Sequence, residues 1–250
     1  MTPPPKKAFK LGLALSGGGA RGIAHLGVYQ ALLEQGKEPD IIAGTSAGAL
    51  VGSLLCAGRT PQELLELFAS KNLFSFIQLK LPSRGLLDLS GLEKTLLELI
   101  PYKRLEDLPK PLVVAVSDLK KGRVEYLEEG PLAKLVTASS CIPILFNPIE
   151  WEGRMLVDGG LFDNIPVTPI RDRCQTVMAV NASPLSEANS LKNLAEVAVR
   201  VFELGAVDRS RDCAPDVLLE PAELAGMPLL DNKQAKKLFR LGYEAAMEHL

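Results

Sequence analysis

The chain has 250 residues, which is enough for one large α/β domain or for two small ones. Hydrophobic residues make up 47% of it and charged residues 23%, an ordinary composition for a globular protein with a sizeable core. The formal net charge of -2 argues against a general nucleic-acid binder, and no apolar run approaches the roughly 18 residues of a membrane-spanning helix.

The N-terminal stretch MTPPPKKAFK carries no apolar segment of the kind found in a signal peptide. We therefore expect a flexible tail over residues 1–8, a single domain over residues 9–250 and a cytoplasmic location. The four cysteines are spread along the chain without CxxC spacing: Cys56, Cys141, Cys174 and Cys213. This spacing predicts reduced thiols rather than disulfides or zinc ligands, and we expect neither a metal ion nor a cofactor.

The first predicted strand, residues 11–15, ends at Ser16 and leads into a glycine-rich loop and a helix over residues 23–33. The loop consists of Gly17, Gly18, Gly19, Ala20, Arg21 and Gly22. Bare backbone between a strand and a helix can present its N–H groups to a negative charge. The loop matches the GxGxxG pattern of dinucleotide sites, but the acidic residues Glu38 and Asp40 precede the second strand instead of ending it. No GK[ST] follows, which argues against a P-loop.

The next strand, residues 40–44, runs into the pattern GxSxG and a helix of small residues over 47–58. The pattern consists of Gly44, Thr45, Ser46, Ala47 and Gly48. A serine on such a tight strand-to-helix turn projects its hydroxyl from the end of the sheet, and the flanking glycines prevent a clash where strand and helix approach each other. This context makes Ser46 a candidate nucleophile.

Two capping boxes, beginning at Thr60 and at Ser90, predict further helix starts. The stretch between them, residues 72–89, contains Phe74, Phe76 and two basic residues without a clear period. Two interpretations stay open for it: a connection packed on the core, or a mobile apolar cover near a lipid site.

The remaining elements continue the alternation of strands and helices. Strands are expected at residues 111–119, 123–129, 154–160, 176–181 and 216–220, and helices at 131–141, at 190–206 and from about Lys233 onwards. This order predicts an α/β fold, a three-layer α/β/α sandwich with a mainly parallel central sheet.

A glycine loop and a serine turn at the ends of neighbouring parallel strands would face each other. The N–H groups of Gly17, Gly18 and Gly19 would then form an oxyanion hole for an acyl carbonyl attacked by Ser46. The alternative is that the glycines only make a tight packing turn. For Arg21 we consider a packing contact beside the loop, or a role in holding the loop open or meeting an anionic head group.

A serine nucleophile needs a base, and the candidate is Asp158, which ends a predicted strand before Gly159 and Gly160. Taken alone, such an aspartate is more often a turn-forming residue. The chain has two histidines, His25 and His249. The second is the penultimate residue, and the first lies beside the oxyanion loop, where capping the helix is the more common role. We therefore expect a base other than histidine.

Taken in order, GGGARG at 17–22, GTSAG at 44–48 and DGG at 158–160 resemble the patatin-like phospholipase family, and ASSCIPILFNP at 138–148 resembles a further block of it. The resemblance covers residues 11 to about 170, and Cys141 departs mildly from it, standing where a small residue is usual. It implies the three-layer fold and a Ser–Asp dyad, with Ser46 as nucleophile, Asp158 as proton acceptor and Gly17, Gly18 and Gly19 as the oxyanion loop.

The function that the resemblance implies is hydrolysis of fatty-acyl ester bonds of phospholipids, lysophospholipids or related lipids. The expected partners are a lipid ester substrate and, through peripheral contact, the inner face of the membrane, with no nucleic acid. Two alternatives remain open: acyl transfer or thioester cleavage at the same site, and a dormant lipid-binding regulator. The sequence makes no prediction of head group, chain length or oligomeric state.

Overall fold

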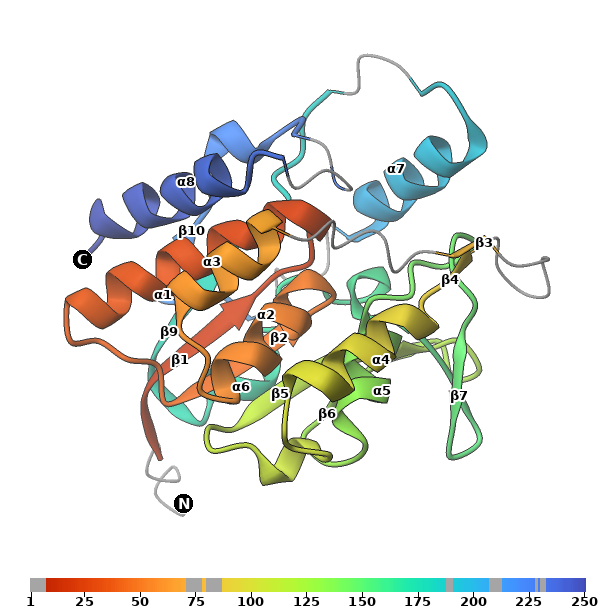
Figure 1. Ribbon diagram of the computed structural model, residues 1–250, viewed down its shortest axis with the longest axis horizontal. Helices are drawn as coiled ribbons and strands as arrows, with labels where there is room; N and C mark the ends of the chain where they lie inside the picture. The colour runs from red at the N-terminus through yellow and green to blue at the C-terminus, as the bar shows by residue number, and fades with distance from the viewer. Residues whose placement is uncertain are drawn as a thin grey trace.

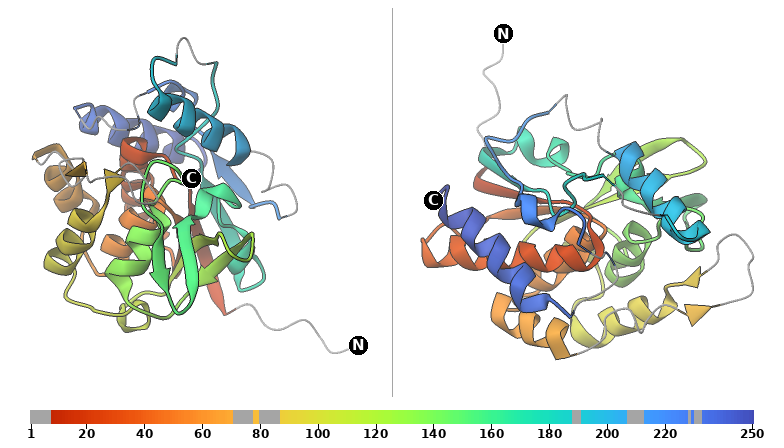
Figure 2. Two further views of the ribbon diagram at one scale, coloured as in Figure 1. Left: turned by 90° about the vertical axis from the view of Figure 1, so that its right-hand side faces the viewer. Right: turned by 90° about the horizontal axis from the view of Figure 1, so that it is seen from above.

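The structure, a computed structural model, describes residues 8–70, 78–79, 87–187, 191–206, 213–227, 229 and 233–250. The predicted tail, apart from residue 8, and most of the stretch 72–89, including Phe74 and Phe76, lie outside the described residues. Figure 1 shows a central sheet with helices packed on it, and Figure 2 shows the same arrangement from two further sides. No helix among the described residues has the length and apolar character needed to cross a membrane.

Eight strands of the described residues form the central sheet. Seven form a path in the order β10 (Val217–Leu219), β9 (Cys174–Val180), β1 (Phe9–Leu15), β2 (Ile41–Thr45), β5 (Leu112–Asp118), β8 (Arg154–Asp158) and β7 (Ile149–Trp151), and β6 (Arg123–Leu127) also pairs with β5. The pairings from β10 to β5 are parallel, whereas β6 and β8 run antiparallel to β5, and β7 antiparallel to β8. The predicted mainly parallel sheet is therefore confirmed. Two short strands, β3 (Gln78–Leu79) and β4 (Leu87–Asp88), pair separately.

Side chains alternate between the two faces of this sheet, as the period of a strand requires. On one face Leu13 and Leu15 join the large core under six helices: α1 (Ala24–Glu34), α2 (Ala47–Cys56), α3 (Pro61–Ser70), α4 (Ser90–Leu99), α5 (Leu132–Ser139) and α8 (Ala235–Met247). On the other face Ala14 belongs to a smaller core covered by the short helix α6 (Thr168–Arg171). The α/β/α layering is thus present, with a thin second helical layer in the described part of the chain.

Helix starts follow local capping chemistry. At Thr60 the predicted capping box forms, because the Thr60 amide donates to Glu63 Oε2 at 3.0 Å and the Glu63 amide donates to Thr60 Oγ1 at 3.3 Å. The box predicted at Ser90 is wrong: the serine is already helical, and its amide donates to Asp88 Oδ1 at 2.8 Å. The aspartate two residues ahead has replaced the serine as the local acceptor.

Four short 3₁₀ turns connect described elements: η1 (Gly19–Ile23), η3 (Leu105–Asp107), η4 (Gly159–Leu161) and η6 (Ala222–Leu224). Helix α7 (Leu194–Ala206) lies beyond the carboxyl ends of the parallel strands, apart from the layer that contains α1 and α8 (Figure 1). The turns η1 and η4 and this helix surround the candidate site.

Candidate active site

Ser46 stands on the sharp turn between β2 and α2. Its backbone is at φ 53 and ψ -118, a left-handed conformation that is uncommon for a residue with a side chain. The turn is tight enough that a Cβ at Gly44 would come within 2.5 Å of the Gly48 carbonyl oxygen. The predicted need for a small residue at this position is therefore confirmed, and Ser46 sits in the strained geometry typical of a nucleophile elbow.

The strained turn is held by a buried serine that the sequence analysis did not single out for this role. Ser139 Oγ accepts the Ser46 amide at 2.9 Å and donates to the Ala115 carbonyl of β5 at 2.7 Å. Its side chain is completely buried at the end of α5. The elbow is thus tied to a helix and to a strand, and the block that begins at residue 138 was the only sequence signal for this contact.

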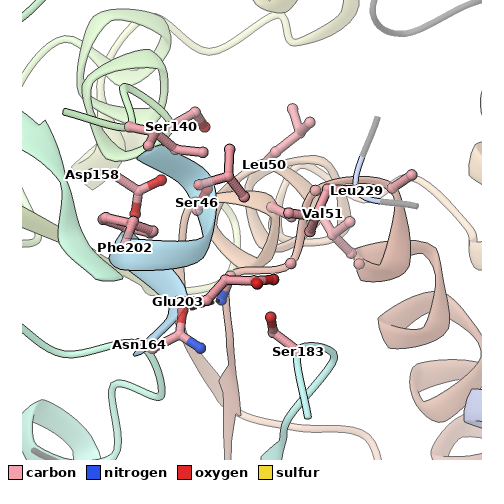
Figure 3. Close-up of a pocket in the computed structure, with 18 of the residues that line it drawn as sticks. Ser46, Leu50, Val51, Ser140, Asp158, Asn164, Ser183, Phe202, Glu203 and Leu229 are labelled. Atoms are coloured by element: carbon pink, nitrogen blue, oxygen red, sulfur yellow. Dashed lines mark hydrogen bonds between the residues drawn. The ribbon is translucent and has the colours of Figure 1, made fainter. Parts of the chain in front are cut away.

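Asp158 ends a strand, as predicted, and this strand runs against its neighbour in the sheet. β8 is antiparallel to β5, with Asp158 level with Val116. Because β2 ends level with Ala115 while β5 continues to Asp118, the end of β8 arrives beside the end of β2. The two side chains lie side by side at the cavity (Figure 3).

The carboxylate of Asp158 is buried, at 1% exposure, and only partly hydrogen-bonded. Its Oδ1 accepts the Gly160 amide at 2.8 Å, whereas Oδ2 has no well-formed hydrogen bond among the described residues. Burial raises the pKa of Asp158 from 3.8 to about 7, and the neighbouring Ser46 hydroxyl and the Gly160 amide oppose this rise. A carboxylate with this pKa can accept a proton near neutral pH.

The glycine loop lies against the serine turn, since a Cβ at Gly17 would be 3.3 Å from Cβ of Ser46. The Gly17 amide is already engaged: it donates to the Asn164 carbonyl at 3.3 Å and to Asn164 Oδ1 at 3.2 Å. Gly18 and Gly19 have φ 152 and φ 57, and their amides donate to no group among the described residues. Two of the three predicted donors are therefore free to bind an oxyanion in the resting protein.

His25 supports the loop from behind. Its Nε2 lies 2.9 Å from the Ser16 carbonyl, an acceptor, so the proton is assigned to this nitrogen. The ring is fully buried, and burial lowers the pKa of His25 to about 4. The Ser16 hydroxyl in turn donates to the Gly17 carbonyl at 2.7 Å and accepts the Ala182 amide at 2.8 Å. His25 thus acts as a neutral donor that fixes the strand end, and His249 is exposed on the last turn of the chain.

Arg21 links the glycine loop to α7. Its guanidinium lies 2.7 Å from both Glu203 Oε1 and Ser183 Oγ, and its Nε donates to the Gly18 carbonyl at 3.4 Å. The side chain is 4% exposed and does not line the cavity. This placement favours the loop-holding interpretation over contact with a lipid head group.

Arg21→Gln should destabilise the protein by about 3 kcal/mol, because it breaks a buried ion pair and leaves Glu203 with Arg200 alone. The kcat on a phospholipid and on a neutral short-chain ester should fall by the same factor, since the loop and not the head group is affected. The matched control is Arg173→Gln, which removes an exposed pair with Glu128 and should change little. A loss confined to the phospholipid would contradict this role.

A cavity of about 430 Å³ opens over Ser46. Figure 3 shows Leu50, Val51 and Leu229 on one side of it and Asn164, Ser183 and Glu203 on another. Most of its lining is apolar, supplied by Ile23, Ala47, Leu50, Val51, Phe68, Leu89, Leu92, Ile142, Leu145, Phe146, Ile165, Leu185, Val199, Phe202, Leu218 and Leu229. The cavity therefore suits a ligand with an apolar chain next to a small polar group.

The two acidic residues considered for a dinucleotide site lie away from the glycine loop. Glu38 pairs with Lys110 at 2.6 Å, and Asp40 Oδ2 accepts the Lys10 and Leu11 amides, so neither carboxylate reaches the glycine loop. No group of three or more His, Cys, Asp or Glu side chains in the described part of the chain is arranged to hold a metal ion. Cys141 packs in a small core with Leu145 and Phe146.

The fold and the site together define an α/β protein with a serine on a nucleophile elbow, a buried carboxylate beside it and a glycine loop opposite. The sequence model of the patatin-like phospholipases matches residues 13–170. The chain belongs to the patatin-like phospholipase family.

Two curated relatives and one solved structure illustrate the range of similarity. An uncharacterized NTE family protein of Mycobacterium tuberculosis (strain ATCC 25618 / H37Rv) is 34% identical over 163 residues, which cover 64% of this chain and 45% of that protein. Lysophospholipase NTE1 of Saccharomyces cerevisiae is 28% identical over 94% of this chain but only 16% of its own length. The crystal structure of VipD from Legionella pneumophila has a TM-score of 0.56 at 17% identity, covering 97% of this chain and 66% of VipD, and shows a similar fold. This chain thus spans less than half of either curated relative.

Proposed function

We propose that this protein is a serine hydrolase that cleaves fatty-acyl ester bonds of phospholipids, lysophospholipids or related lipids. Ser46 is the nucleophile, Asp158 the proton acceptor, and the glycine loop the oxyanion hole. The observation that carries the proposal is the juxtaposition of a strained serine and a buried, incompletely hydrogen-bonded carboxylate with a pKa of about 7.

The reaction would proceed in two steps, acylation of Ser46 and hydrolysis of the acyl-serine. As Ser46 Oγ bonds to the acyl carbonyl, its proton moves to Asp158 Oδ2, and the oxyanion accepts hydrogen bonds from the Gly18 and Gly19 amides. Collapse breaks the ester bond, and Asp158 returns the proton to the leaving alcohol. Water then attacks the acyl-serine while Asp158 takes its proton. As the bond between the acyl carbon and Ser46 Oγ breaks, Asp158 passes this proton to Oγ, which releases the fatty acid and regenerates the Ser46 hydroxyl.

The choice of a lipid ester rests on the cavity and on the family. A mainly apolar space of about 430 Å³ beside Ser46 accommodates an acyl chain, and family membership adds the phospholipase chemistry. The name lysophospholipase, given to the yeast relative, points to the same substrate class, although this chain corresponds to 16% of that protein.

A panel of defined lipid esters tests this proposal. Purified protein should release free fatty acid from at least one phospholipid or lysophospholipid and should be labelled by a fluorophosphonate. Absence of both signals would support a dormant lipid-binding regulator instead. Labelling without fatty-acid release, with product formed only when an acceptor alcohol or a thioester is supplied, would support acyl transfer or thioester cleavage.

The pH dependence of kcat/KM should report the ionisation of Asp158. Only the carboxylate can accept the serine proton, so activity on a neutral short-chain ester should rise about tenfold per pH unit below pH 7 and level off above about pH 8. Asp163, whose pKa burial raises to about 6, is the matched control, because its carboxylate binds Tyr126 and not Ser46. The inflection should persist in Asp163→Asn, and a flat profile in the parent protein would contradict the assignment of Asp158.

A further inference from the structure

Exposed large hydrophobic side chains are concentrated in one part of the described chain. Six of the eleven lie between residues 185 and 204, with exposures from 38% to 67%: Leu185, Leu191, Leu194, Val197, Val201 and Leu204. Of the other five, Leu97, Leu119, Leu218 and Met247 lie apart from this segment in the sequence, and Ile144 is considered below. A contiguous exposed apolar patch marks a site of interaction, whereas single exposed residues are normal.

Four of the six residues form a stripe along α7. Leu194, Val197, Val201 and Leu204 follow one another at spacings of three, four and three residues, which places them on one face of a helix. The opposite face carries Val199, Phe202 and Glu203, which line the cavity over Ser46. The same helix therefore forms a wall of the cavity and an apolar outer surface.

Ion pairs on its inner side hold α7 in this orientation. Glu203 binds Arg21 at 2.7 Å and Arg200 at 3.5 Å, and Arg200 donates to the Ser186 carbonyl at 2.6 Å. The side chains of the outer stripe are 38% to 67% exposed, and α7 lies at the periphery of the molecule in all three views (Figures 1 and 2). An apolar stripe on an anchored helix would normally be buried.

Ile144 is a further exposed apolar residue near α7, and its backbone is strained. Ile144 is 64% exposed at φ 72, a strained conformation that a β-branched side chain rarely adopts. Its neighbours Ile142 and Leu145 line the cavity, and Val199 of α7 packs against their cluster. An isoleucine is thus held in solvent at the edge of the same cavity.

We propose that the α7 rim, defined as Leu194, Val197, Val201, Leu204 and Ile144, docks on a lipid surface. The occupant follows from the position of the rim: α7 walls the cavity with Val199 and Phe202, and Ile144 adjoins the cavity-lining Ile142 and Leu145, so a lipid surface on the rim would lie beside the cavity and supply its substrate. The described charges of this segment, Glu187, Lys192, Glu196, Arg200 and Glu203, sum to -1, so apolar insertion and not attraction to anionic lipid drives the contact. This inference rests on the proposed function, since it takes the substrate to be a lipid.

Sedimentation with phosphatidylcholine vesicles tests the proposal, using Ser46→Ala protein so that no lipid is hydrolysed. The double variant Leu194→Gln/Val201→Gln should weaken vesicle binding about tenfold or more, because two side chains lose their apolar insertion. Leu97→Gln/Leu119→Gln, which changes two exposed leucines elsewhere, should bind like the parent. Raising the salt from about 0.1 M to about 0.5 M should leave binding unchanged.

Activity measurements separate this proposal from the proposed function. With Ser46 intact, the α7 double variant should keep its kcat/KM on a soluble short-chain ester and lose hydrolysis of vesicle lipid. Equal vesicle binding by the parent and the α7 variant, no binding by the parent, or a parent dimer that the same substitutions dissociate would overturn the docking surface. Vesicle binding that depends on α7, without fatty-acid release from any ester, would overturn the proposed function and leave the surface standing.

Discussion

Ser46→Ala should abolish ester hydrolysis and fluorophosphonate labelling together, with a loss of at least about 10⁴-fold in kcat. Alanine keeps the Cβ and therefore the strained backbone at φ 53, and the Ser46 amide can still donate to Ser139 Oγ. The melting temperature should consequently stay close to that of the parent. Mass spectrometry of the labelled protein and release of fatty acid from a soluble ester measure the two losses.

The other serines near the site provide the control. Ser140 also lines the cavity, but its hydroxyl donates to the Val136 carbonyl at 3.2 Å, so Ser140→Ala should retain most activity. Ser16 and Ser139 are buried, with their hydroxyls engaged in hydrogen bonds to backbone groups. If fluorophosphonate labelling persists in Ser46→Ala, the nucleophile is one of these three residues and not Ser46.

The strands β1, β2, β5, β6, β8, β9 and β10 were predictable in their order along the chain, because buried strands are apolar runs between turn signals. The short strands β3, β4 and β7 were not predicted. The sequence did not reveal the direction of β8. A strand's direction depends on how its connections cross the sheet, and the chain from β5 to β8 passes through a hairpin and a helix that could return on either side. Asp158 meets Ser46 because β5 is longer than β2, a difference of register that periodicity does not encode.

The parts of the candidate site that a short sequence motif forms were predictable. The contacts between residues far apart in the sequence were not. The glycine loop and the serine turn each lie within six residues and follow from strand–turn–helix patterns. The Gly17 amide donates to Asn164, which is 147 residues away in the sequence. Arg21 pairs with Glu203, which is 182 residues away. Such contacts depend on tertiary packing, and Glu203 lies in a helix beyond the last recognisable motif.

Asp158→Asn should lower kcat by roughly 10²–10⁴-fold while making the protein more stable at alkaline pH. The folded protein raises the pKa of Asp158 from 3.8 to about 7, so it binds the proton more tightly than the unfolded chain. The stability associated with the protonated form is therefore complete below pH 3.8 and is lost as the pH rises towards and through about 7. Since one pKa unit corresponds to about 1.4 kcal/mol, ionisation costs the fold up to about 4 kcal/mol at pH 8, and asparagine avoids this cost.

The test is to measure melting temperature and turnover on the same samples at pH 5 and pH 8. The melting temperature of Asp158→Asn minus that of the parent should be larger at pH 8, because the parent carries the buried charge only there. His25→Gln keeps a donor for the Ser16 carbonyl but offers no imidazole, and His249→Ala removes an exposed ring, so both should retain most activity. An active Asp158→Asn protein beside a well-folded but inactive His25→Gln protein would replace the carboxylate by the histidine as the base. If Asp158→Asn is instead more stable at pH 8 and loses turnover, the Asp158 carboxylate destabilises the fold and is required for activity. Its catalytic role would then explain why an ionisable group stays buried beside the strained serine.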